Sequence, residues 1–188
     1  MTKRNLLKQE LIEAWKQTID GPYKKMLINS ERGLAVHFVR ILMEVFRDHK
    51  VSRDIYIEPT LVLEQGNTRI PDLVICDSKQ VIGIVELKYA PRGLPQYEKD
   101  LETLRLIQEK LDDLKLSNER YRGPSERKPL PFAKDLVLCW AAVHKDKPFP
   151  DRRILEIQKL GGYYLDLRAA ASTSGTKAFV DDKEVPEC

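Results

Sequence analysis

Two apolar runs separated by a short polar segment constrain the fold of this chain more than any other feature of its sequence. Residues 70–76 read Ile-Pro-Asp-Leu-Val-Ile-Cys, and residues 82–88 read Ile-Gly-Ile-Val-Glu-Leu-Lys. The segment between them, residues 77–80, has the composition of a turn. We therefore predict that the two runs pair as the strands of an antiparallel hairpin.

Charged residues interrupt these runs where a buried strand should have none: Asp72, Glu86 and Lys88. Unpaired charges are costly to bury, so their presence indicates a site. Side chains alternate along a strand, so Glu86 and Lys88 point to the same face, ~7 Å apart. A turn centred near Lys79 places Asp72 directly opposite Glu86, with Cβ atoms about 5 Å apart. A register shifted by one residue would move Asp72 to the other face, and turn composition alone does not decide between the two.

Two carboxylates at this separation repel each other unless a cation lies between them. Mg²⁺ takes hard oxygen ligands and is often held by one or two carboxylates. The backbone carbonyl of Leu87 could supply a third protein oxygen. Lys88 would then orient the nucleophile or offset charge that builds up on an attacked phosphate. The alternative is an ordinary ion pair between charges at strand ends.

Pro71-Asp72 followed by Glu86-Leu87-Lys88 resembles the signature of the PD-(D/E)xK nuclease superfamily, the restriction-endonuclease-like proteins. The resemblance implies an α/β fold with a mixed central sheet flanked by helices. Its core would be a helix, a three-strand antiparallel meander, a second helix and a further strand, over roughly residues 30–167.

The same resemblance implies a function, a nuclease that hydrolyses phosphodiester bonds with Mg²⁺ or Mn²⁺, most often in DNA. Asp72, Glu86 and the Leu87 carbonyl would bind metal, and Lys88 would position the nucleophile. A duplex nuclease of this size would act as a homodimer or with a protein partner that provides specificity. The alternative function is a catalytically inactive module of the same fold that binds nucleic acid or protein, and an RNA-directed or small-molecule phosphodiesterase also stays open.

Two further residues are site candidates because the superfamily places functional groups at matching positions. Glu31 begins a predicted helix over residues 31–48, in phase with its apolar stripe, and would join the metal site; the alternative is a first-turn glutamate favoured by the helix dipole. Gln96 begins a predicted helix over residues 95–116 and would contact the phosphate or the attacking water, with Lys99 behind it. We interpret the neighbouring Asp100 as a packing or capping residue.

The remaining pattern predicts one domain over residues 1–168 and a loosely ordered tail over residues 169–188, where Ser, Thr, Gly and Ala are followed by acidic residues. An N-terminal accessory helix, residues 3–19, is expected to pack on the core or on a second subunit through its apolar stripe of Leu7, Leu11, Trp15 and Ile19. The other expected elements are a first core strand (54–64), a strand buried on both faces (136–143), a short helix (152–160) and a last strand (163–167).

Composition limits the partners and the compartment. The net charge of the 188 residues is only +3, so a nucleic-acid contact must come from a local patch. A polar loop, residues 117–131, is a candidate for that contact, although solvated charge is the simpler reading of its basic residues, Arg120, Arg122, Arg127 and Lys128. The scattered cysteines, Cys76, Cys139 and Cys188, indicate reduced thiols and a cytoplasmic protein, and no run has membrane-spanning length.

Overall fold

The structure is a computed structural model that describes residues 3–62, 68–116, 130–181 and 183–185. Its helices are α1 (Lys3–Thr18), α2 (Glu31–Asp48), α3 (Glu98–Glu109) and α4 (Asp151–Leu160), with a π-helical turn (Ile19–Tyr23) after α1 and a 3₁₀ turn (Gly161–Tyr163) after α4. Its strands are β1 (Asp54–Ile57), β2 (Leu61–Val62), β3 (Thr68–Arg69), β4 (Leu73–Cys76), β5 (Val81–Ala90), β6 (Lys115–Leu116), β7 (Phe132–Lys145), β8 (Tyr164–Ser172), β9 (Gly175–Val180) and β10 (Lys183–Val185).

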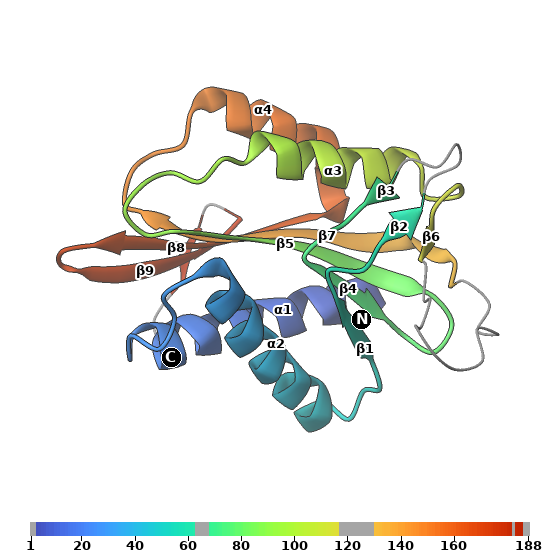
Figure 1. Cartoon of the computed structure of the whole chain (residues 1–188), viewed down its shortest axis with the longest axis horizontal. Helices are drawn as coiled ribbons and strands as arrows, with labels where there is room; N and C mark the ends of the chain where they lie inside the picture. The colour runs from blue at the N-terminus through green and yellow to red at the C-terminus, as the bar shows by residue number, and fades with distance from the viewer. Residues whose placement is uncertain (1–2, 63–67, 117–129, 182, 186–188) are drawn as a thin grey trace.

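These elements form an α/β fold in which helices flank a mixed central sheet. Within the described residues the sheet has seven strands in the order β1-β4-β5-β7-β8-β9-β10, and β5, β7 and β8 run parallel to one another. Helices α1 and α2 cover one face, and α3 and α4 cover the other (Figure 1). A small second sheet, β3-β2-β6, lies beside α3.

The predicted hairpin and its register are confirmed. Strands β4 and β5 pair antiparallel with Leu73 opposite Val85 and Ile75 opposite Gly83. Asp72 immediately precedes β4, so the same register places it opposite Glu86. The side chain of Asp77 closes the turn by accepting the backbone N–H groups of residues 79 and 80 at 2.8 and 2.9 Å. A turn fixed in this way favours one register over its neighbours.

Strand β7 carries the apolar run predicted to be buried on both faces. Its side chains alternate between two cores because successive residues of a strand point to opposite faces. Cys139 and Ala141 face α1 and α2, whereas Leu138 and Trp140 face α3 and α4. Since β5 and β8 flank β7, strand β5 lies next to the central strand of the described sheet.

Helix α1 is an integral part of the core and not an accessory to it. Leu7, Leu11, Trp15 and Ile19 are at most 1% exposed. The helix approaches β5 so closely that a Cβ atom added at Gly83 would lie 2.9 Å from a methyl group of Leu7. Of the two positions expected for this helix, the structure has the one on the core.

Two expected elements, a strand and a helix, differ from those observed. The strand expected over residues 54–64 is broken at Glu58, whose φ is 48°, and its halves β1 and β2 belong to different sheets. The helix expected over residues 95–116 ends at Glu109, because the chain turns there and residues 115–116 pair with β2.

The expectation of a loosely ordered tail is wrong for residues 169–181 and 183–185. Strand β8 continues to Ser172, and β9 and β10 extend the sheet. Ala169 and Ala170 are buried in β8. The Ser, Thr and Gly residues that suggested disorder form the tight β8–β9 turn, where Ser172 pairs with Gly175.

Candidate active site

The predicted site residues of the hairpin lie together near the centre of the sheet. Glu86 and Lys88 pair in register with Trp140 and Ala142 of β7, so both point to the face covered by α3 and α4. Glu86 is only 6% exposed, whereas Asp72 and Lys88 are half-buried. Asp72, Glu86 and Lys88 lie in or near a buried region because the apolar residues next to them in β4 and β5 pack into the cores on the two faces of the sheet.

Asp72 is bound to the strand that carries the other two residues. Its Oδ2 atom accepts the backbone N–H of Leu87 at 2.6 Å. Burial raises the pKa of Glu86 to about 9, and the nearby carboxylates of Asp72 and Asp100 add to the effect. Glu86 therefore favours its protonated form next to these two carboxylates.

Lys88 is held between carboxylates from two helices. Its Nζ atom lies 3.2 Å from Oδ2 of Asp100 and 3.8 Å from Oε1 of Glu31. It also donates to the Leu87 carbonyl at 3.1 Å. Burial by itself lowers the pKa of Lys88, but the surrounding carboxylates, Asp100 first, outweigh burial and raise it. Lys88 is therefore a fixed cation at neutral pH.

The structure places Glu31 beside Lys88, although its side chain is exposed, and its predicted role at a metal site stays a prediction. Ser30 caps α2 by accepting the N–H of Gly33 at 3.0 Å, and this starts the helix with Glu31 beside the end of β5. Oε2 of Glu31 accepts the backbone N–H of Tyr89 at 3.3 Å. Burial raises the pKa of Glu31, and Lys88 opposes the rise. Glu31 thus contacts Lys88 and the backbone of β5.

Asp100 is a site residue that the sequence interpretation missed. It is 7% exposed, pairs with Lys88, and accepts the indole N–H of Trp140 at 3.1 Å. Burial raises its pKa, against the effects of Lys88 and Trp140. The sequence carries a signal for it, since Asp100 is in phase with the apolar stripe of Leu104 and Ile107. A carboxylate on the buried face of a helix needs a partner.

Gln96 is not brought into this cluster. It is exposed in the loop before α3, because the helix begins at Glu98 and not near residue 95. Within the described part of the chain, Gln96 forms no hydrogen bond or ion pair with the other site residues. The basic loop over residues 117–131, with Arg120, Arg122, Arg127 and Lys128, lies outside the described residues apart from its last two positions.

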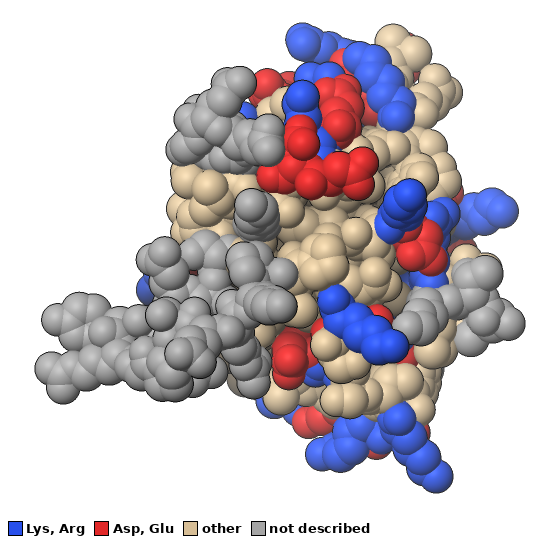
Figure 2. All heavy atoms as spheres, turned by 90° about the vertical axis from the view of Figure 1, so that its right-hand side faces the viewer, with Lys and Arg blue, Asp and Glu red and all other residues tan. Residues whose placement is uncertain are grey.

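A cavity of about 460 Å³ lies between β3 and α3. Two of its lining residues are close in sequence to site residues, since Ile70 is two residues before Asp72 and Lys99 directly precedes Asp100. The wall residues carry two cationic, two hydroxyl, one apolar and one acidic side chain: Arg69, Lys99, Thr68, Thr103, Ile70 and Glu102. On the side of the molecule seen in Figure 2, the described basic and acidic side chains are interspersed and form no broad basic surface.

The predicted metal ligands can be tested for their fit to a metal ion. Among the described residues, no three His, Cys, Asp or Glu side chains converge as a metal-binding group. The predicted set requires only two side chains, Asp72 and Glu86, together with the Leu87 carbonyl. These are hard oxygen donors, the ligand class that Mg²⁺ takes in proteins. Their donor chemistry is therefore of the type that suits a hard divalent cation.

Comparisons with protein-family models, with curated proteins and with solved structures find no match to this chain. Its relation to the PD-(D/E)xK superfamily thus stays a prediction. In the described segments, every helix is too short or too polar to span a membrane.

Proposed function

We propose that this chain is a nuclease that hydrolyses phosphodiester bonds, most readily in DNA, with Mg²⁺ or Mn²⁺ as the cofactor. The observation that carries the proposal is the imbalance of charge in a site that is buried at Glu86 and Asp100 and partly buried at Asp72 and Lys88. Lys88 is the ammonium group among four carboxyl groups, which come from Glu31, Asp72, Glu86 and Asp100. Uncompensated charge is destabilising when buried, and perturbed carboxyl groups cluster at functional sites.

Each residue has a role in this proposal. Asp72 and Glu86, with the Leu87 carbonyl, would hold the cation, and Glu86 would give up its proton on binding. The cation would supply charge neutralisation at the phosphate and acidify a water molecule. Lys88 orients the attacking water and offsets charge that develops on the phosphate. Glu31 and Asp100 hold the Lys88 ammonium group in place.

The order of elements supports a restriction-endonuclease-like core. Helix α2 is followed by β1, β4 and β5 as an antiparallel meander, then by α3, and then by β7 parallel to β5. This is the succession that the resemblance implies, interrupted by the small sheet. We include this fold assignment in the proposal.

The cavity beside the site supports a polyanionic substrate. Arg69 and Lys99 line it from opposite walls, and a phosphodiester backbone needs cationic groups on either side of the cleaved bond. Because the cationic groups are few, tight binding of a duplex would require a second copy of the chain or a partner protein.

Cleavage of supercoiled plasmid, linear duplex and single-stranded DNA with Mg²⁺, Mn²⁺ or EDTA tests this function. Lys88→Ala is expected to lower the cleavage rate at least about 100-fold, since it removes a fixed charge beside the phosphate. Lys79→Ala is the matched control, because Lys79 is an exposed lysine in the turn at the opposite end of β5. Equal cleavage by Lys88→Ala and the wild type would contradict the proposal, and absence of both cleavage and metal binding would favour an inert binding module.

A further inference from the structure

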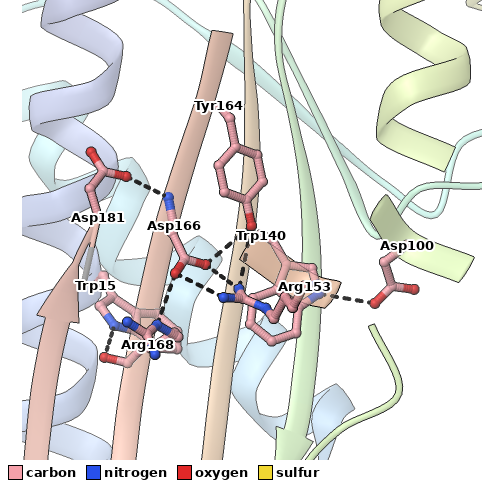
Figure 3. Close-up of polar contacts among 8 residues, drawn as sticks. All are labelled: Trp15, Asp100, Trp140, Arg153, Tyr164, Asp166, Arg168 and Asp181. Atoms are coloured by element: carbon pink, nitrogen blue, oxygen red, sulfur yellow. Dashed lines mark hydrogen bonds and ion pairs between the residues drawn. The ribbon is translucent and has the colours of Figure 1, made fainter. Parts of the chain in front are cut away.

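A buried tryptophan lies between the candidate active site and a second polar cluster (Figure 3). Trp140 on β7 is fully buried. The edge of its ring donates the indole N–H to Oδ2 of Asp100 at 3.1 Å. The same oxygen lies 3.2 Å from the ammonium group of Lys88. One carboxylate oxygen is thus shared by the tryptophan and the lysine.

The face of the Trp140 ring is covered by a guanidinium group. The Cζ atom of Arg153, on α4, lies 4.4 Å from the ring centroid. Arg153 is 1% exposed and also lies 4.4 Å from the ring centroid of Phe149. A desolvated cation over an aromatic face is attracted to it, so Arg153 restricts the position of the indole.

Arg153 is in turn fixed by the buried carboxylate of Asp166 on β8. It donates to both carboxylate oxygens of Asp166, one of them at 3.3 Å. The Tyr164 hydroxyl donates to the same carboxylate at 3.1 Å, and Nε of Arg168 lies 2.8 Å from it. Asp181 accepts the backbone N–H of Asp166 at 3.0 Å. This cluster therefore leaves Arg153 little freedom.

The sheet itself sets the spacing between the two clusters. Glu86, Trp140 and Asp166 are in register on the adjacent strands β5, β7 and β8, so their side chains form one row on the same face. Stability alone accounts poorly for the buried ion pair, because apolar residues of similar volume often stabilise a core as well or better. Lys88, by contrast, has a long flexible side chain that must be restrained in order to act on one atom.

We propose that Trp140 is a positioning residue, which fixes the Asp100 oxygen that holds the ammonium group of Lys88. The buried pair of Arg153 and Asp166 fixes the ring of Trp140 in turn. This inference rests on the proposed hydrolytic function for its effect on rate, whereas the contacts that it requires can be tested without activity.

The chain contains two tryptophans, and the second provides a matched control. Trp15 is also fully buried and donates its indole N–H to the Arg168 carbonyl at 3.3 Å, on the opposite side of the sheet. Phe at either position removes one indole hydrogen bond from a buried site. Only the change at Trp140 removes a bond to the lysine-holding carboxylate.

The experiment compares single-turnover cleavage by Trp140→Phe and Trp15→Phe, together with substrate affinity. Trp140→Phe is expected to lower the cleavage rate about tenfold or more, with substrate affinity changed less than about twofold, because a hydrogen bond to a charged group is lost. Trp15→Phe should leave the rate within about twofold of the wild type, since its bond is remote from Lys88. Equal rates for the two variants would overturn the inference.

A second measurement tests the hydrogen bond between Trp140 and Asp100 without any cleavage assay and with both tryptophans intact. The indole N–H groups give one resonance each in an ¹⁵N correlation spectrum of the full chain, and Asp100→Asn should displace that of Trp140 while leaving that of Trp15 in place. Displacement of neither resonance would overturn the inference. If the wild type cleaves no substrate, the proposed function fails, and the two resonances still decide whether Trp140 holds Asp100.

Discussion

Glu86 has a side-chain pKa far from that of an ordinary glutamate. Its pKa, about 9 against an ordinary value of 4.5, means that the folded protein keeps a proton that the unfolded chain loses. Burial is the main cause, followed by the repulsion from Asp72 and Asp100. A carboxyl group whose ionised form is destabilised by burial and by neighbouring carboxylates would be stabilised in that form by a cation.

We predict that Glu86→Gln raises the free energy of unfolding of the metal-free protein, by about 1–3 kcal/mol near pH 8. The folded state binds more protons than the unfolded state between the two pKa values, so Glu86 lowers stability progressively as pH rises through this window. Glutamine carries no such proton, and the gain should therefore be larger at pH 8 than at pH 5.

Denaturant unfolding at the two pH values, in EDTA, measures this difference. Glu44→Gln is the control, because Glu44 is a solvent-exposed partner of Arg40 on α2. A gain that does not depend on pH, or one matched by the control, would show that Glu86 is ionised in the folded protein.

The sequence reveals some site residues and hides others for a physical reason. Asp72, Glu86 and Lys88 stand out because they interrupt apolar strands. Asp100 is visible only as a charge on a helical stripe, and Trp140 looks like any core residue of β7. Its role depends on which groups the sheet and α3 bring together, and no local pattern contains that information.

At the scale of elements, the periodicity of apolar residues predicts the helices and strands that form from residues close in sequence. The spans of α1 and α2, and the burial of β7, follow from their apolar patterns. The break between β1 and β2 is harder to predict from the sequence, since it depends on a positive φ at Glu58 and on pairing with a distant strand, β6. Strands β9 and β10, by contrast, pair with their neighbours in sequence across tight turns, and the polar composition of this segment hides them.

Helix α1 provides a prediction at this scale. Leu11→Ala should lower the free energy of unfolding by about 2–5 kcal/mol, because it opens a cavity between α1 and the sheet. Leu11 is 0% exposed, whereas Val36 on α2 is 58% exposed, and Val36→Ala should cost less than about 0.5 kcal/mol. Chemical denaturation measures both. Similar small losses for the two variants would mean that α1 is peripheral.

Across the whole molecule, the sheet continues beyond the expected end of the domain. Strand β9 pairs with β8 from Leu167 to Ser172 and shields its outer edge. Strands β5, β7 and β8 carry the candidate site and the carboxylate that binds Arg153, so the C-terminal strands support this region of the sheet from one side. The domain that the structure describes therefore includes residues 169–185, apart from residue 182.

A chain that ends at Arg168 is expected to aggregate or to unfold at a clearly lower temperature than the full chain. The truncation exposes the hydrogen-bonding groups of β8 and removes Asp181, which binds the backbone of Asp166. Thermal unfolding and size-exclusion chromatography of the two chains compare them. Identical melting and elution would show that residues 169–188 contribute nothing to the fold.

The measurement that tests the central claim most directly is calorimetric titration of the protein with Mn²⁺ at pH 7.5, in two buffers that differ in ionisation enthalpy. Because Glu86 holds a proton when no cation is bound, binding between Asp72 and Glu86 should release close to one proton per site. Glu86→Gln should bind more weakly and release none. Absence of binding, or binding without release of a proton, would contradict the claim that these two carboxyl groups form a metal site.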